Sequence, residues 1–452
     1  MTKARLTILI MLSLSSVLSV FWGTILERSA HGIIVDFKVV YLGARCLIQH
    51  HSPYDETQLM SVYLAEGGSR PLTPSDLNRV RQVVALQVYF PTAFIYIAPF
   101  ALLPWPMAHL FWTVLTAAGF TLAAFLTWTL GEKLAPSASF YLICFLLVNC
   151  GILYAGGNPA GIAVALCIVA SWCFLQDKHV IVGVLCLAVS LGLKPHDSGF
   201  VWLYFLLAGG VHRKRALQSA AIVIAMGMPA IFWVTQVSPH WIEGLLSNLS
   251  ATAVHGGITD PGRDAMSSSG GGAIIDLQTV ISVFKDDPQF YNPVTYLVCG
   301  PLLLIWAIVT VRTRFSVSRA YLALAAIAAL SMLPVYHRTH DAKLLLLTIP
   351  ACALLLREGG ILGKVALLVN TAAIVLTSDF PLALLATLSK DLSKSVVSFG
   401  GEIVMVLIAR PIPLVLLVVG CFYLAVYVRR STEQSVASSG SGKSVLLEEI
   451  PT

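Results

Sequence analysis

Apolar runs of membrane length recur from the first residues of this chain almost to its end. The first run covers residues 6–26, and further runs follow at short intervals as far as residue 428. A helix that crosses a bilayer needs about 20 apolar residues, or fewer where neighbouring helices cover its ends. Of the 452 residues, 57% are hydrophobic and only 12% are charged, which excludes an ordinary soluble protein. We therefore predict an all-α, polytopic integral membrane protein.

The first apolar run has the form of a signal anchor. It follows Lys3 and Arg5, as a signal sequence does. A cleavage point after Ala30 would need a small residue three positions before it, where Arg28 stands. We therefore expect the run to be retained. The nine cysteines lie mostly inside apolar runs without metal-ligand spacing, and we expect them to pack rather than to form disulfides.

Positively charged residues concentrate in a few short loops. Such loops are typical of the cytoplasmic side of a membrane protein, so the net charge of +6 does not indicate nucleic-acid binding. From residue 176 onward the spans that alternate cleanly with these loops are 180–193, 197–210, 217–237, 293–311, 320–336, 341–356, 361–378 and 412–428. The basic segments are residues 176–179, 212–215, 312–319, 357–364 and 429–430.

Whether segment 83–103 crosses the membrane determines on which side of it the following loops lie. If it crossed the membrane, the loop at 176–179 would face outside. Pro91 and Pro99 interrupt the segment, and Tyr89 favours a membrane interface, so we expect it to lie along the outer surface. A thirteenth span is the alternative. The amino-terminal spans are then 6–26, 107–130, 138–154 and 159–175, which gives about twelve in all.

This topology predicts a single transmembrane domain over residues 1–428, followed by a tail. Three long loops, 27–106, 238–290 and 379–411, face outward. The second of them is glycine-rich near its middle and could act as a lid that orders on substrate. The tail, residues 429–452, is rich in serine and glycine, and we predict that it is disordered in the cytoplasm.

The unusual polar residues fall on the outward side of this topology. Asp36 lies about ten residues past the first run, among apolar and aromatic neighbours where a carboxylate is costly to desolvate. It indicates a site, although an ordinary boundary residue is the simpler interpretation. A transporter more often has ionisable residues near the midplane in two matching halves, and no such halves are visible. We therefore favour a reaction at the outer surface of the membrane over transport through it.

Five motifs occur in the order found in one enzyme family. They are Asp36-Phe37-x-Val39-x-Tyr41-x-Gly43-Ala44-Arg45 with Ser52-Pro53-Tyr54-Asp55, then Tyr89-Phe90-Pro91, Ala98-Pro99-Phe100-Ala101-Leu102-Leu103-Pro104, Gly157-Asn158 and Gly192-Leu193-Lys194-Pro195. Over residues 30–350 the chain thus resembles the family 87 GT-C glycosyltransferases, which include polyprenol-phosphate-mannose-dependent alpha-mannosyltransferases. It departs from them in Thr92, where the family has a second proline, and in His337-Arg338-Thr339-His340-Asp341, where many relatives have Ser-Pro-x-Ser-Trp-x-His.

The resemblance implies a GT-C-like fold with two juxtamembrane helices in the first outer loop and an acidic catalytic base there. The enzyme would move a sugar, expected to be mannose, from a polyprenyl-phosphate donor to a glycan or glycolipid acceptor. The reaction would take place at the outer face of the cytoplasmic (inner) membrane, with Asp36 as the general base. The alternative function is a non-catalytic transporter or flippase of lipid-linked sugars.

The departing lipid phosphate gains negative charge, so fixed cations should surround it. Our candidates for this donor phosphate site are Lys194, Arg338, His337, His340 and Arg45, and our candidates for acceptor contacts are Tyr41 and Asn158. Simpler interpretations remain open: Lys194 could snorkel at a helix end, Arg45 could be solvated, and Asn158-Pro159 could be only a turn into a helix. His337 and His340 with Asp341 form a weak metal pattern. We assign no residues to a metal and no cofactor, and metal dependence is left open.

Overall fold

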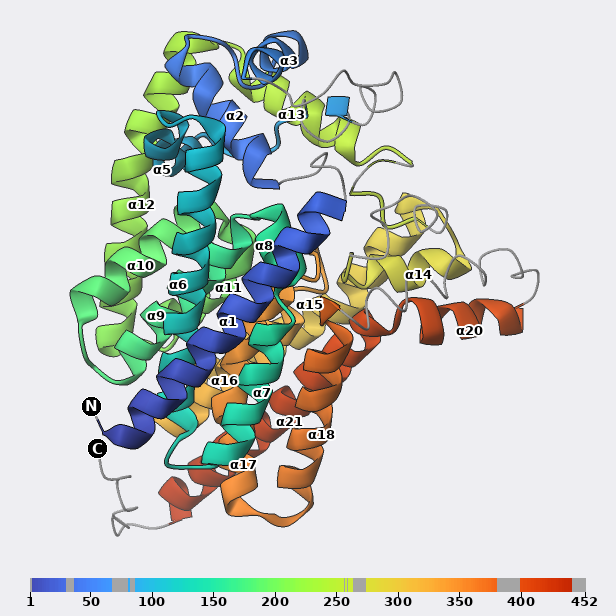
Figure 1. Cartoon of the computed structure of the whole chain (residues 1–452). Coiled ribbons are helices and arrows are strands. Elements are labelled where there is room, and N and C mark those ends of the chain that lie inside the picture. The colour runs from blue at the N-terminus through green and yellow to red at the C-terminus, as the bar shows by residue number, and fades with distance from the viewer. Residues whose placement is uncertain are drawn as a thin grey trace.

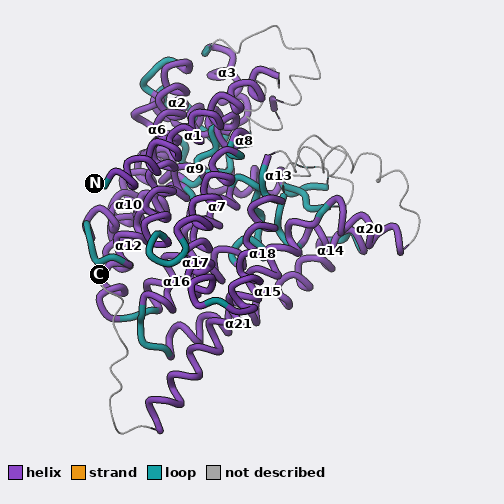
Figure 2. Tube along the Cα trace, turned by 60° about the horizontal axis from the view of Figure 1, so that its bottom comes forward, coloured by secondary structure: helices purple, strands orange, loops and turns teal. Residues whose placement is uncertain are grey.

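The computed structural model shows an all-helical architecture in the described part of the chain (Figure 2). The only strand-like pairing among these residues is an isolated bridge between Ile274 and Arg338. The predicted all-α class is therefore confirmed. The structure describes residues 2–29, 36–66, 80–81, 86–255, 257, 259–262, 274–379 and 399–440.

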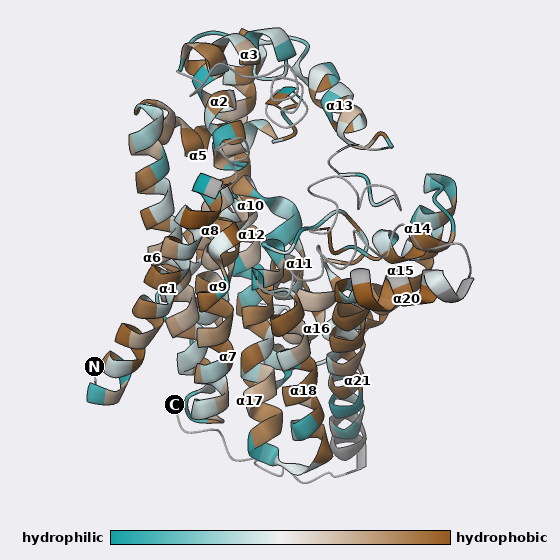
Figure 3. Cartoon of the chain, turned by 45° about the vertical axis from the view of Figure 1, so that its right-hand side comes forward, coloured by the Kyte–Doolittle hydropathy of each residue, from teal (hydrophilic) through white to brown (hydrophobic). Residues whose placement is uncertain are grey.

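Five of the described helices are long and apolar enough to cross a membrane. Large apolar side chains on them stay uncovered by protein: Phe21, Ile224 and Leu297 are 66%, 65% and 74% exposed. Exposed apolar surface of this extent suits lipid, and Figure 3 shows apolar colouring along the long helices. The chain is thus an all-α membrane protein. The five helices are α1 (Lys3–Ser29), α6 (Trp105–Gly131), α12 (Gly210–Val237), α15 (Pro288–Arg312) and α21 (Pro411–Gly440).

Shorter helices occupy the remaining predicted spans. They are α7 (Pro136–Val148), α8 (Gly151–Gly156), α9 (Ala160–Leu175), α10 (Val180–Leu193), α11 (Pro195–Leu207), α16 (Val317–Leu330), the 3₁₀ helix η3 (Asp341–Thr348), α17 (Ile349–Glu358) and α18 (Gly360–Leu376). Every segment predicted as a span is therefore helical over most of its length. Three of them depart from a single continuous α-helix.

The three departures have local causes. The predicted span 320–336 ends as a helix at Leu330, because Pro334 has no amide hydrogen to bond back to that turn. The span 138–154 breaks after α7, where the Asn149 side chain turns back and donates to the Phe145 carbonyl at 2.9 Å. The span 341–356 begins as η3 and becomes an α-helix only near Pro350, which favours the first turn of α17.

The first part of the predicted tail, residues 429–440, belongs to a helix in the described part of the chain. The helix α21, which begins as an apolar span, continues to Gly440. Arg429 and Glu433, four residues apart, add a side-chain pair at 2.9 Å on its surface. Residues 441–452 lie outside the described part of the chain.

The start of α1 and the carboxyl-terminal end of α21 lie at the same end of the helix bundle (Figure 1). We call this the basic end, because ion pairs of its loops join there: Arg5 with Glu132, Arg215 with Asp177, and Arg430 with Glu358. Arg5 near the start of α1 meets Glu132 just past the end of α6, so these two helices run in opposite directions. The connection between them, residues 30–104, therefore begins and ends at the opposite end of the bundle.

Short helices cover this opposite end, which we call the site end: α2 (Asp36–Ile48), α3 (Glu56–Ala65), α5 (Pro91–Ala101) and α13 (Trp241–Thr252). Helix α5, within the ambiguous segment 83–103, has 11 residues, about half of what a span requires. Asp55 caps α3 by accepting from the Gln58 amide at 2.9 Å.

The other two predicted outer loops are partly helical. They contain α13 with α14 (Gln278–Phe284), and α20 (Phe399–Ala409). Residues 263–273, where a lid was predicted, and residues 380–398 lie outside the described part of the chain.

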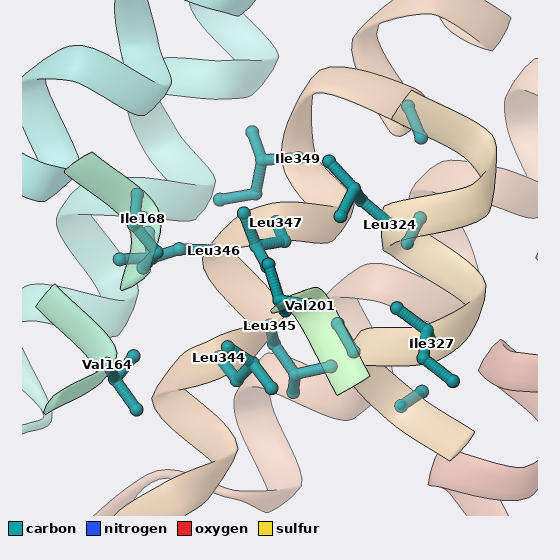
Figure 4. Close-up of a cluster of buried hydrophobic side chains, with 14 of the residues drawn as sticks. Val164, Ile168, Val201, Leu324, Ile327, Leu344, Leu345, Leu346, Leu347 and Ile349 are labelled. Atoms are coloured by element: carbon teal, nitrogen blue, oxygen red, sulfur yellow. The ribbon is translucent and has the colours of Figure 1, made fainter. Parts of the chain in front are cut away.

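The centre of the bundle is a continuous apolar core. Helix η3 runs through it, and its residues Leu344–Leu347 are buried between α9, α11 and α16 (Figure 4). Val164, Ile168, Val201, Leu324, Ile327 and Ile349 surround this segment. Because η3 is fixed by packing on all sides, its first residue, Asp341, has a fixed position below the site end.

Helix α2 is held just as firmly. The aromatic ring of Phe37 stacks on that of Trp112 with centroids 4.4 Å apart. Gln87 donates to the Val39 carbonyl at 2.9 Å. At Gly43 there is no room for a side chain, because a Cβ would lie 2.5 Å from Gln87 Nε2 and 2.6 Å from a ring carbon of Phe94. The close approach of α2 to α5 thus depends on a glycine.

We predict that Gly43→Ala lowers the unfolding midpoint of the purified protein, because the added methyl group must displace Phe94 or Gln87. Overpacking of this kind costs about 1–3 kcal/mol. The matched control is Gly300→Ala in α15, where a Cβ would meet nothing within 4 Å. That substitution should leave the midpoint unchanged or raise it, since alanine favours a helix by about 1 kcal/mol. Equal midpoints for the two variants would contradict the packing described.

Candidate functional site

Asp36 is the first residue of α2 and points toward the turn between α8 and α9. Its Oδ2 atom accepts a hydrogen bond from Nδ2 of Asn158 at 2.7 Å. The same oxygen is 3.4 Å from where a Cβ at Gly156 would lie, so the turn passes close to the carboxylate. A carboxylate in the first turn of a helix is stabilised by the helix dipole. The amide contact therefore fixes the orientation of a favourably placed acid.

The turn that carries Asn158 needs a glycine before it. Gly157 has a φ of 59°, in the left-handed region, and a Cβ there would lie 2.9 Å from that of Phe37. Its carbonyl accepts from the Trp112 indole at 2.7 Å. Asn158 Oδ1 then accepts from the Ala160 amide at 2.9 Å and caps α9. The predicted turn into a helix is confirmed, and the same side chain also reaches Asp36.

Lys194 lies at the junction of α10 and α11 and is 7% exposed. Pro195 follows as the first residue of α11 and keeps the backbone of Lys194 extended. This conformation directs the lysine side chain inward. Its ammonium forms an ion pair with Asp341, lies 3.5 Å from Asp197 Oδ2, and donates to Asn158 Oδ1 at 3.4 Å. Lys194 is therefore a buried member of the site and does not snorkel to the surface.

The segment between α16 and η3 supplies the remaining charged groups. It is held by backbone bonds to residues 274–277, including one from the Ile275 amide to the His337 carbonyl at 2.9 Å. Asp341 Oδ2 accepts from the Arg338 amide at 2.7 Å, and the guanidinium of Arg338 donates to the Tyr336 hydroxyl. His340 Nε2 is 3.5 Å from Asp341 Oδ1.

The pKa shifts distinguish the residues that carry a positive charge from the histidines. Burial alone would lower the pKa of Lys194, but the Asp197 and Asp341 carboxylates outweigh it and the pKa rises. Burial also opposes the charge of Arg338, yet Tyr336 and Asp36 raise its pKa overall. Two permanent cations therefore face the carboxylates of this site.

The two histidines are neutral at pH 7. Burial lowers the pKa of His340 to about 4, against the field of Asp341. Burial likewise lowers the pKa of His337, although Asp341 and the carbonyls of Val335 and His196 favour its charged form. This charge state differs from the role of fixed cation predicted for both residues.

Five predicted residues meet in this network: Asp36, Asn158, Lys194, Arg338 and His340, with His337 beside them. Two others do not join it. Tyr41 is fully buried and donates to the Leu103 carbonyl at 2.8 Å, and Arg45 pairs with Glu66 at 2.7 Å. Both belong to the opposite side of α2, because nine residues of helix turn Arg45 about 180° away from Asp36. They anchor α2 to its neighbours.

The sequence reasoning did not choose five other residues that lie at the site: Tyr89, His196, Asp197, Tyr336 and Asp341. Three of them had a signal in the sequence. His196 and Asp197 directly follow Lys194-Pro195, and Asp341 follows His340. Tyr89 opens the motif Tyr89-Phe90-Pro91 but was interpreted only as an interface residue, and no comparable signal marked Tyr336.

Comparison of the chain with protein-family models, curated proteins and solved structures finds no match. The resemblance to family 87 therefore stays a prediction based on the motifs. What the arrangement can do chemically follows from the geometry of the site.

We predict that Lys194→Met lowers stability by about 3–5 kcal/mol, because it leaves Asp341 buried without its partner. Adding Asp341→Asn should recover part of this loss, since the unpaired charge is then removed. Unfolding midpoints in detergent measure both effects. The control is Lys285→Met, whose side chain is 59% exposed and pairs with Asp287 at 3.2 Å. A Lys194→Met variant as stable as this control would refute the buried ion pair.

Proposed function

We propose that this chain is a membrane glycosyltransferase that uses a polyprenyl-phosphate sugar donor. One observation carries the proposal: the Asp36 carboxylate lies in a single network with two permanent cations, Lys194 and Arg338, drawn from segments far apart in sequence. Transfer from a lipid phosphate needs both parts, a base for the acceptor and positive charge for the leaving group. The motif order of family 87 supports the same assignment.

In the proposed reaction an acceptor hydroxyl attacks the anomeric carbon of the donor sugar. The new bond joins that carbon to the acceptor oxygen, and the bond from the carbon to the phosphate oxygen breaks with its electron pair. Asp36 takes the hydroxyl proton as attack proceeds. The 2.7 Å contact from Asn158 orients the carboxylate and leaves its other oxygen for the acceptor.

Arg338 is the better candidate for the contact with the departing phosphate. A guanidinium presents two parallel donors to phosphate oxygens, and the Asp36 carboxylate is near enough to influence the pKa of Arg338. Lys194 is already held by Asp341 and Asp197, so it positions Asn158 and adds to the local field. His337 and His340 would enter the reaction as neutral groups.

The proposal includes the topology. We infer about twelve spans in a GT-C-like arrangement, with the basic end in the cytoplasm and the site end at the outer face of the cytoplasmic membrane. The two juxtamembrane helices of the first outer loop would be among α2, α3 and α5. The donor is a polyprenyl-phosphate sugar, expected to be mannose, and the acceptor is a glycan or glycolipid. A transporter or flippase is the competing function, but the ionisable cluster gathers at one end of the bundle.

We predict that Asp36→Asn reduces sugar transfer by about 10²–10⁴-fold, because the amide cannot accept the hydroxyl proton. Envelope glycans of a deletion strain would first identify the missing sugar and acceptor. Transfer by the purified variants would then be followed with a short-chain polyprenyl-phosphate donor of that sugar. Asp177→Asn, which alters a 77% exposed aspartate at the basic end, is the matched control and should transfer normally. Normal turnover by Asp36→Asn would exclude the base, and a missing sugar in the deletion strain without any transfer by the purified protein would favour the competing function.

We predict that a cysteine at His240 reacts with an impermeant thiol reagent in intact cells, whereas one at Lys178 reacts only after permeabilisation. His240 is 83% exposed at the start of α13, and Lys178 is exposed in the basic loop after α9. The unsubstituted protein, with its nine cysteines, sets the background. Labelling with the opposite sidedness would reverse the proposed orientation.

A further inference from the structure

A second group of side chains lies behind the Asp36 network. His196, Asp197 and His337 each offer one ligand atom, and these atoms lie within 4.8 Å of one another. Nε2 of His196 is 3.6 Å from Asp197 Oδ1, and Nε2 of His337 is 3.7 Å from the same oxygen. The first two residues follow Lys194 on α11, and the third comes from the segment after α16.

The hydrogen-bonding groups of this cluster are not satisfied within the described part of the chain. Asp197 is only 2% exposed, yet neither of its carboxylate oxygens has a hydrogen-bond partner there. Nε2 of His337, in a side chain 1% exposed, also has none. Buried polar atoms without a partner cost about 1–3 kcal/mol each, so this arrangement indicates a missing ligand.

The tautomer of His337 defines what kind of ligand is missing. Its Nδ1 is 2.9 Å from the Val335 carbonyl, and a carbonyl can only accept, so Nδ1 carries the proton. In the neutral ring, Nε2 then presents a lone pair toward Asp197 Oδ1. A proton on either atom would not bridge them, because 3.7 Å exceeds the range of a hydrogen bond. A cation between the two atoms satisfies both.

We propose that His196, Asp197 and His337 bind a divalent transition-metal ion such as Zn²⁺. Two imidazole nitrogens and one carboxylate oxygen are typical ligands for it, whereas Mg²⁺ prefers oxygen alone. Ligands about 2.1 Å from a tetrahedral ion lie about 3.4 Å apart, a few tenths of an ångström closer than the two separations from Asp197 Oδ1, and all three ligand atoms lie within 4.8 Å of one another. The Val335 contact is the backbone hydrogen bond that usually orients a metal-binding histidine. His196 is 38% exposed, which leaves a path for the ion and an open coordination position.

The ion would also change the charge of the site. Lys194 and Arg338 already face the Asp36 and Asp341 carboxylates there. A divalent ion would add positive charge, which suits a phosphate leaving group. The Lys194 ammonium, 3.5 Å from Asp197 Oδ2, would repel the ion. Its ion pair with Asp341 holds the lysine in place. This role rests on the proposed function, whereas metal binding does not.

Metal content tests the proposal directly. The full-length protein, purified in detergent and stripped with a chelator, would be dialysed against Zn²⁺, Mn²⁺ or Mg²⁺ and analysed by mass spectrometry. We expect about one Zn²⁺ per chain and little Mg²⁺. Co²⁺ in its place should give visible absorption bands typical of nitrogen and oxygen ligands. Asp197→Asn and His196→Gln should bind Zn²⁺ at least tenfold more weakly. His240→Gln, at an 83% exposed histidine, should bind like the unsubstituted protein.

His196→Gln keeps the test decisive if Asp197→Asn fails to fold, because its side chain is partly exposed. No bound metal in the unsubstituted protein, or equal binding by His196→Gln, would overturn the proposal. Asp36→Asn separates it from the proposed function, since that variant should lose transfer and keep its Zn²⁺. Stoichiometric Zn²⁺ in a protein that transfers no sugar would uphold the metal site and refute the transferase.

Discussion

The site depends on one buried ammonium group. Lys194 lies between α10 and α11. Its ion pair with Asp341 joins that junction to the start of η3. Its contact with Asn158 extends the connection to α9, and through Asn158 to Asp36 on α2. Burying a charge is costly unless it is paired and hydrogen-bonded. The lysine therefore requires its partners, and that requirement brings four distant segments of the chain together.

Irregular backbone surrounds this ion pair, in a protein that is otherwise helical. Pro195 and Pro334 interrupt the helical paths, and Gly157 turns the chain in a left-handed conformation. Non-helical backbone at membrane depth is tolerated only where it is buried in protein or lines a polar cavity. Here the interruptions coincide with the charged network. The same breaks that end the helices direct Lys194, Asn158 and the segment from His337 to Asp341 toward a common point.

The two ends of the bundle use charge in different ways. At the basic end, pairs such as Arg430 with Glu358 are substantially exposed, and such pairs contribute little to stability. At the site end the pairs are buried, and their removal would leave uncompensated charges. This asymmetry supports the orientation proposed above, in which the two ends of the bundle meet different surroundings.

Much of the fold followed from the sequence, because apolar length and helix-breaking residues act locally. Segment 83–103 and the turn at Asn158 were interpreted in this way, and the helices occupy the segments expected. The chemistry-bearing residues at helix junctions were also visible as polar breaks in apolar runs. Where helix continuity was assumed without attention to Pro334, the helix ends at Leu330, before the predicted end at residue 336.

Only the tertiary structure decided which polar residues meet. Asp197 and His337 are 140 residues apart, and no local pattern brings their side chains within 3.7 Å. Tyr41 and Arg45 were chosen for their motif, but the rotation of α2 turns them away from Asp36. The sequence by itself determined where helices form, because that depends on neighbours along the chain. The packing of those helices determined the site, because charge pairing and burial depend on neighbours in space.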